Sequence, residues 1–128
     1  MEETDLGSGQ SHLRVVRYTE SMNPWLLLIA AVILEVIGTT ALKLSEGFTR
    51  LWPSLTVVAG YLLAFIALGL VLKRMEVSVA YAVWAGLGTA LVALVGVFFF
   101  GEAMTWVKAA SLLLIVTGLI GLNLASGG

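Results

Sequence analysis

The sequence contains no cysteine, two prolines and one histidine among 128 residues, and only 12% of its residues are charged. Without cysteine the chain cannot form a disulfide framework, a thiolate metal site or a cysteine nucleophile. The histidine, His12, belongs to a polar N-terminal stretch, so we expect no catalytic or ligand role for it. The sequence therefore predicts neither a metal site nor a cofactor.

The charged residues form no basic patch, because the net charge is −1 and the cations lie at the ends of apolar runs. This pattern argues against nucleic-acid binding. Apolar residues, in contrast, make up 59% of the chain and give a mean hydropathy of +1.01, far above an average soluble domain. We expect a lipid bilayer to surround most of the chain.

Four apolar runs have the length that a spanning helix needs, which is ~20 residues. We expect helices over about 24–44, 53–72, 77–100 and 105–125. The connections SEGFTRLW, KRME and GEAM are short, so each helix should pack antiparallel to the one before it. The prediction is an all-α membrane protein, with residues 22–128 forming an up-down bundle of four transmembrane helices.

Residues 1–21 are polar and of mixed charge, and we expect them to form a disordered tail. Met22 opens a second plausible beginning, so this tail is either a native extension or the product of an upstream start site. Lysine and arginine are nearly balanced between the two ends of the bundle, four against three. Since this bias sets orientation, we expect both orientations to insert.

Glu35 is the one charged residue in the middle of a predicted span. It lies eleven residues after Pro24, which places it ~16 Å into a hydrocarbon core ~30 Å thick. An acid near the midplane is costly and is by default a functional hypothesis. The alternative is a protonated carboxyl that only holds helices together.

The face of the helix around Glu35 is mostly small, because Ala31, Gly38 and Thr39 lie three or four residues from it. Such a face admits a bound molecule or a closely packed helix. Aromatic side chains that can attract a cation occur in the second and third helices. They are Tyr61, Tyr81 and Trp84, for which ordinary packing is the alternative.

Small residues also mark the last two helices. Gly86 and Gly88 interrupt the middle of the third helix, where they permit either a hinge or close packing. Ser111, Gly118 and Gly121 give the fourth helix a surface on which another membrane helix can approach closely. Small residues are common in membrane helices, so this pattern alone identifies no partner for the surface.

Four segments together resemble the small multidrug resistance family: MNPWLLL, LEVIGTTALKLSEGFTRLWPS, AYAVWAGLG and GLIGLNL. The resemblance covers residues 22 to about 125. It implies a multi-pass protein of the inner (plasma) membrane that exports lipophilic or quaternary ammonium cations in exchange for protons. It also implies a transporter rather than an enzyme, and an antiparallel homodimer in which two copies of Glu35 face one chamber. The implied dimer interface lies on the fourth helix at Ser111, Gly118 and Gly121. The implied binding aromatics are Trp84, Tyr61, Tyr81 and Trp25.

Within that family, Gly38 and Thr39 are typical of quaternary ammonium exporters, whereas guanidinium exporters carry tryptophan at the position of Gly38. Two residues depart from the family pattern: Ser111 replaces a glycine of the dimer surface, and Ala64 stands where serine is familiar. Export of guanidinium or polyamines, in some cases with a second chain, stays open. A membrane subunit that only assembles with other proteins is the remaining alternative.

Overall fold

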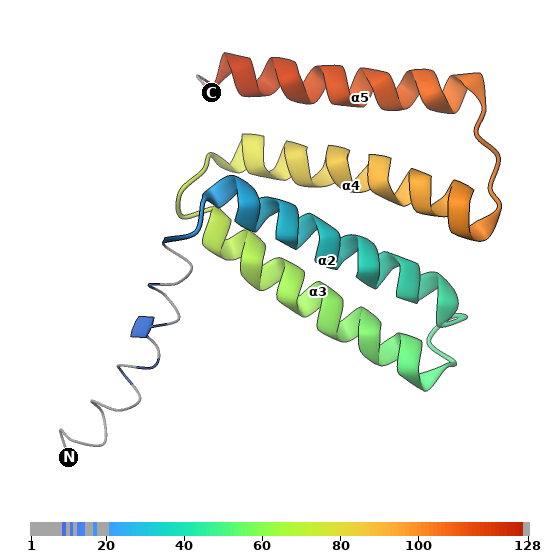
Figure 1. Ribbon diagram of the computed structural model, residues 1–128, viewed down its shortest axis with the longest axis horizontal. Coiled ribbons are helices and arrows are strands. Elements are labelled where there is room, and N and C mark those ends of the chain that lie inside the picture. Colours follow the sequence, from blue (N-terminus) through green and yellow to red (C-terminus); the bar gives the residue numbers. More distant parts are fainter. Residues whose placement is uncertain (1–8, 10, 12, 15–16, 18–20, 127–128) are drawn as a thin grey trace.

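The computed structural model describes residues 9, 11, 13–14, 17 and 21–126 (Figure 1). Over these residues it contains four long helices and no strand: α2 (Pro24–Leu44), α3 (Leu51–Val71), α4 (Val77–Phe100) and α5 (Trp106–Ala125). All four are long and apolar enough to cross a membrane. The predicted fold class, an all-α protein with four spans, is confirmed. The disordered tail stays a prediction, because most of residues 1–21, His12 included, lie outside the described part.

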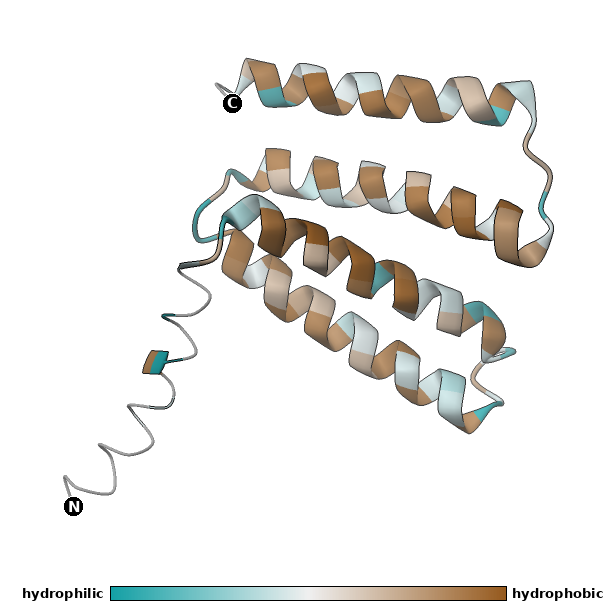
Figure 2. Ribbon diagram, in the orientation of Figure 1, coloured by the Kyte–Doolittle hydropathy of each residue, from teal (hydrophilic) through white to brown (hydrophobic). Residues whose placement is uncertain are grey.

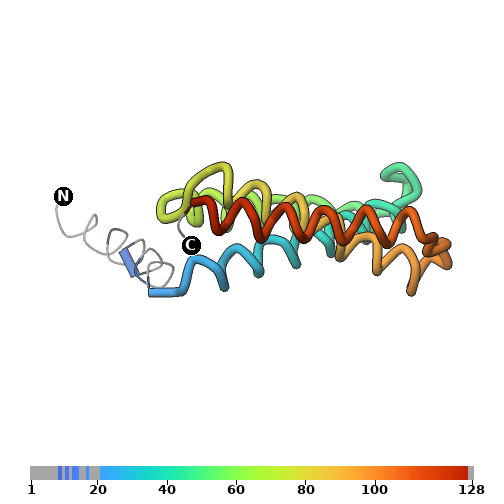
Figure 3. The backbone as a smooth tube through the Cα atoms, turned by 90° about the horizontal axis from the view of Figure 1, so that it is seen from above, coloured from blue at the N-terminus to red at the C-terminus, as the bar shows by residue number. Residues whose placement is uncertain are grey.

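Successive helices run in opposite directions, as the short connections predict (Figure 1). Helix α2 packs against α3 on one side and α4 on the other, while α5 lies at the edge and contacts mainly α4 (Figures 1 and 3). Apolar residues make up most of each of the four helices, with mean hydropathies between 1.9 and 2.3 over their most apolar windows (Figure 2). A helix that is apolar all round is typical of a membrane span.

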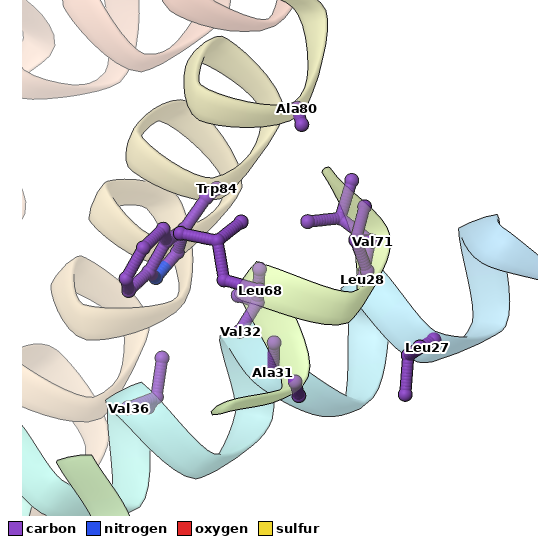
Figure 4. Close-up of a cluster of buried hydrophobic side chains, with 10 residues drawn as sticks. Leu27, Leu28, Ala31, Val32, Val36, Leu68, Val71, Ala80 and Trp84 are labelled. Carbon is purple, nitrogen blue, oxygen red and sulfur yellow. The ribbon is translucent and has the colours of Figure 1, made fainter. Parts of the chain in front are cut away.

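The core lies between α2, α3 and α4, where Leu28, Val32 and Val71 are fully buried (Figure 4). Further along, two glycines bring α2 and α3 together. A Cβ atom on Gly60 would lie 3.1 Å from the carbonyl oxygen of Leu34 and 3.3 Å from the Cα of Gly38. Small residues of this kind let membrane helices approach closely.

The helix ends differ from the predicted ones by one or two residues. Helix α3 begins at Leu51 rather than 53, because Pro53 is tolerated inside a first turn, where its missing N–H costs no hydrogen bond. Helix α5 begins at Trp106, one residue later than predicted. Thr105 caps it by accepting a hydrogen bond from the backbone N–H of Lys108 at 3.1 Å.

Candidate functional site

The carboxyl of Glu35 takes part in a chain of hydrogen bonds that joins α2 to α3. Thr39, one turn further along α2, donates its hydroxyl hydrogen to Oε1 of Glu35 at 3.0 Å. The hydroxyl of Tyr61 on α3 lies 2.7 Å from Oγ1 of Thr39. Since a hydroxyl has one hydrogen to give and Thr39 directs its own at Glu35, Tyr61 is the donor in this second bond.

Gly38 leaves the space in which the ring of Tyr61 lies. A Cβ atom on Gly38 would lie 3.0 Å from both Cδ1 and Cε1 of that ring, closer than ordinary contact allows. The absent side chain therefore lets the ring rest against α2 with its hydroxyl at Thr39. Gly38 is itself buried and acts on the site through Tyr61.

A cavity of about 490 Å³ opens beside Glu35. Its lining comes from α2, α3 and α4 and consists of Glu35, Thr39, Phe65, Tyr81, Trp84, Ala85, Gly88, Thr89 and Val92. Gly88 leaves room for the carboxyl, because a Cβ atom there would lie 3.1 Å from Oε2 of Glu35. The cavity thus combines one acid with an otherwise largely apolar and aromatic wall.

Trp84 is the centre of that aromatic wall. Its ring meets Phe65 at a centroid distance of 5.2 Å and an angle of 74°, and Tyr81 at 6.4 Å and 69°. Both are edge-to-face contacts, a favoured geometry for aromatic pairs. Trp84 is 9% exposed and belongs to the buried cluster (Figure 4), whereas Tyr81 is 63% exposed. Trp84 therefore packs in the core and faces the cavity at once.

Phe65 was missed by the sequence reasoning. It lies four residues after Tyr61, the spacing that places two side chains on the same face of a helix. Counting from Tyr61 along α3 would have found it, just as counting from Glu35 found Thr39. Thr89 was also missed, although it directly follows Gly88.

The residues around Glu35 lie within a stretch shared with known proteins, since the family described as Small Multidrug Resistance protein matches residues 23–115. The chain belongs to this family. It is 50% identical to the quaternary ammonium compound-resistance protein QacF of Klebsiella aerogenes over 105 residues. These residues cover 82% of this chain and 96% of QacF. It is 46% identical over 102 residues to the multidrug resistance protein EbrB of Bacillus subtilis, covering 80% and 87%.

A third relative is the nicotine metabolites export pump subunit NepA of Paenarthrobacter nicotinovorans, 45% identical over 103 residues, which cover 80% of this chain and 89% of NepA. The resemblance inferred from the sequence motifs is confirmed. This small multidrug resistance protein is, by its family and its four apolar helices, a multi-pass membrane protein.

Four residues predicted to bind substrate do not line the cavity of this small multidrug resistance protein: Gly38 and Tyr61, described above, and Ala31 and Trp25. Ala31 is fully buried in the core. Trp25 lies at the start of α2 and lines a separate void of about 210 Å³, together with Arg74 and Asn123. A role for Ala31 or Trp25 in binding stays a prediction, and within one protomer neither reaches the Glu35 cavity.

The two glycines predicted as hinges lie in a continuous α4 and both make close approaches. Gly86 faces α5, because a Cβ atom there would lie 2.6 Å from Cδ1 of Leu119 and 3.0 Å from Cγ2 of Ile115. Gly88 faces Glu35, as described above. Close packing accounts for both positions in this conformation, and flexing at either one stays a prediction.

The predicted dimer surface of this family member faces outward. Ser111, Gly118 and Gly121 are all exposed on α5. A Cβ atom on Gly118 or Gly121 would meet nothing within 4 Å in the protomer. The small side chains are therefore not needed for packing within one chain, which leaves this surface free for a neighbouring helix.

Proposed function

We propose that this protein is a proton-coupled antiporter that exports lipophilic or quaternary ammonium cations, and that protons and the cation compete for Glu35. The observation that carries the proposal is the cavity of about 490 Å³ in which this carboxyl faces Trp84 and Tyr81. An acid supplies the counter-charge for a cation, and aromatic faces add attraction. The name of QacF, a quaternary ammonium compound-resistance protein, supports this class of substrate, and EbrB is named as a multidrug resistance protein.

The coupling follows from the cost of an unpaired charge away from water. A proton removes the charge of Glu35, and an organic cation compensates it. Because either ligand satisfies the carboxyl, binding of one displaces the other. The Thr39 hydroxyl, 3.0 Å from Oε1, donates a hydrogen bond to the carboxyl that pairs with the cation.

Alternating access is supplied by an antiparallel homodimer in the inner (plasma) membrane, whose protomers exchange conformations around a central site. The exposed small residues of α5, Ser111, Gly118 and Gly121, supply its interface. Gly86 and Gly88 are the proposed flexing points. If two protons enter for each monovalent cation, a potential of ~100 mV and a gradient of ~1 pH unit provide ~5 kcal/mol.

One observation favours a second form of the same function. NepA is named as the subunit of an export pump, which supports a version in which this chain works with a second, different chain. Export of guanidinium or polyamines is the alternative substrate class. Gly38 argues against guanidinium, because guanidinium exporters of the family carry tryptophan at this position. In this protein the ring of Tyr61 fills the space above Gly38 instead.

Proton release by the purified protein tests the proposal. In weakly buffered detergent, adding tetraphenylphosphonium should acidify the solution. The Glu35→Gln variant keeps the shape but has no proton to release, so it should show no acidification and no resistance in cells. Glu46→Gln is the matched control, because Glu46 is exposed near the end of α2, and it should behave as wild type.

Two other results would change the conclusion. Larger proton release with guanidinium than with tetraphenylphosphonium would identify the alternative substrate class. Cation binding by wild type without proton release, at any value between about pH 6 and pH 9, would contradict exchange at Glu35. The carboxyl would then be a structural group, and an assembly subunit would be the better description.

A further inference from the structure

Two rows of residues spaced four apart face each other along the contact between α2 and α4, which run in the same direction (Figure 1). The rows are Glu35, Thr39 and Lys43 on α2, and Gly88, Val92 and Gly96 on α4. We call this line of contact the polar seam. Its first level pairs Glu35 with Gly88, and its second level, Thr39 with Val92, lines the cavity beside Glu35.

A second, smaller void of about 90 Å³ continues the seam toward the C-terminal ends of α2 and α4. Its lining consists of Thr39, Thr40, Lys43, Val92, Val95, Gly96, Phe100 and Glu102. Thr39 and Val92 line both voids, so the two are neighbours with Thr39 between them. A water molecule needs ~10–15 Å³ of such space, so a few waters fit where a bulky organic cation does not.

An ion pair closes the outer end of the smaller void. Nζ of Lys43 lies 3.5 Å from Oε2 of Glu102 and 5.0 Å from the centre of the Phe100 ring. The carboxyl of Glu102 occupies the hollow above Gly96, where a Cβ atom would collide with it. The helix end holds Glu102 there, since its backbone N–H donates to the carbonyl of Gly96 at 2.9 Å.

The ion pair between Lys43 and Glu102 is weak enough to break and form again. The side chains of Lys43 and Glu102 are 58% and 45% exposed, and ion pairs exposed to this degree contribute little to stability. Removing the pair therefore need not unfold the helix ends. It would instead widen the entrance between Lys43 and Glu102.

We propose that the polar seam is a proton passage to Glu35, separate from the wide cavity that admits the organic cation, with the pair of Lys43 and Glu102 as its gate. The inference rests on the proposed function, because it assigns a route to the proton that the cation displaces. A hydronium ion among the waters of the seam gives a proton to Oγ1 of Thr39 and becomes water, while the Thr39 hydroxyl gives its own proton to Oε1 of the Glu35 carboxylate. Release follows the same steps in reverse.

The consequence is kinetic. A cation that enters the wide cavity blocks it, so the proton of Glu35 leaves through the seam. Obstructing the seam should slow proton release and leave the equilibrium affinity for the cation unchanged. A merely structural role for Lys43 and Glu102 would move stability or affinity instead.

The test uses the absence of native cysteine, which makes any introduced thiol unique. In the full-length Glu102→Cys protein, benzyl methanethiosulfonate should plug the entrance. Stopped-flow measurement with a pH dye should then show proton release on tetraphenylphosphonium addition about tenfold slower, with the original rate restored by a reductant. Lys43→Cys, on the other side of the entrance, is the second variant and should respond in the same way.

Glu46→Cys with the same reagent is the matched control, because Glu46 also lies near the C-terminal end of α2 but does not line the void. Its proton release should not slow. At a pH high enough that cation binding no longer releases a proton, the cation should bind at the same rate with and without the plug. Equilibrium binding of tetraphenylphosphonium shows that each variant is folded.

The outcomes separate this inference from the proposed function. Unchanged proton release after both entrance positions are plugged would overturn the passage and send the proton through the wide cavity. Equal slowing in the Glu46→Cys control would overturn it as well. Wild type that releases no proton at all would contradict the antiport mechanism itself, and the passage would fall with it.

Discussion

The hydroxyl oxygens of Tyr61 and Thr39 lie 2.7 Å apart, and this single contact links α3 to the carboxyl on α2. Thr39 in turn holds Oε1 of Glu35 at 3.0 Å. The environment of the acid is therefore set by two helices, and a change on α3 should reach Glu35 without touching it.

Replacing Tyr61 with phenylalanine tests that link. The ring of the Tyr61→Phe variant still fits against Gly38, but the donor that supports Thr39 is lost. Without that donor the Thr39 hydroxyl is held less firmly toward Oε1 of Glu35, so the carboxylate that pairs with the cation loses part of its support. We expect affinity for tetraphenylphosphonium at neutral pH to fall about fivefold, as for the loss of one partly buried hydrogen bond.

Titration calorimetry at fixed pH would measure this change. Thr56→Val is the control, since it also removes a hydroxyl from α3, but one that bonds within its own helix to the carbonyl of Trp52. Equal effects of the two variants would mean that the link between Tyr61 and Thr39 is unimportant for binding.

Adding a methyl group at Gly38 should loosen the contact between α2 and α3. The new Cβ would lie 3.0 Å from two carbons of the Tyr61 ring, and overpacking of this kind costs about 1–3 kcal/mol. Gly69→Ala is the matched control, because a Cβ atom there meets nothing within 4 Å. Unfolding in sodium dodecyl sulfate should show Gly38→Ala destabilised and Gly69→Ala at least as stable as wild type.

Trp84 allows packing and binding to be separated. The Trp84→Leu variant should remain a folded dimer but bind aromatic cations about tenfold more weakly, since the flat surface that attracts cations is lost. Trp106→Leu is the comparison, because Trp106 is 90% exposed and does not line the cavity. Unchanged affinity in folded Trp84→Leu would make Trp84 a packing residue only.

The near balance of lysine and arginine predicts that the protein inserts in both orientations. Single cysteines at Glu76 and at Glu46, which lie at opposite ends of the bundle, should each be labelled from both sides of the membrane. Acidic residues contribute little to orientation, so these substitutions should not disturb the balance. Labelling of each site from one side alone would contradict an antiparallel homodimer.

Much of this site could be predicted by counting along single helices. The lone acid and Thr39 one turn away follow from helical spacing, as do Tyr81, Trp84 and Gly88 on α4. What counting cannot show is which neighbour fills the space above a small residue. Helical spacing left Gly38 as room either for a bound molecule or for a neighbouring helix, and the ring of Tyr61 on α3 fills that room.

The position of Glu102 beside Lys43 could not be predicted from the sequence for a similar reason. It belongs to the connection between α4 and α5, where an acid usually meets water. Its place beside Lys43 depends on the hollow at Gly96 and on the way α4 ends. Those features involve two helices and a loop, so no spacing rule within one helix reveals them. Trp25 was predicted to bind substrate only because of the family resemblance. Since Trp25 does not reach the Glu35 cavity of its own protomer, that role would require the second protomer of a dimer.

Helix α5, all of whose residues are described, buries none of them within its own protomer. Most of its surface is then left for lipid or for the partner protomer of the proposed dimer, and in that dimer pairing would add to the contacts that α5 makes with α4. Stability that depends on pairing falls on dilution, by mass action. Drug resistance should accordingly rise more steeply than in proportion to gene dosage, because halving the number of protomers in the membrane removes more than half of the working pairs.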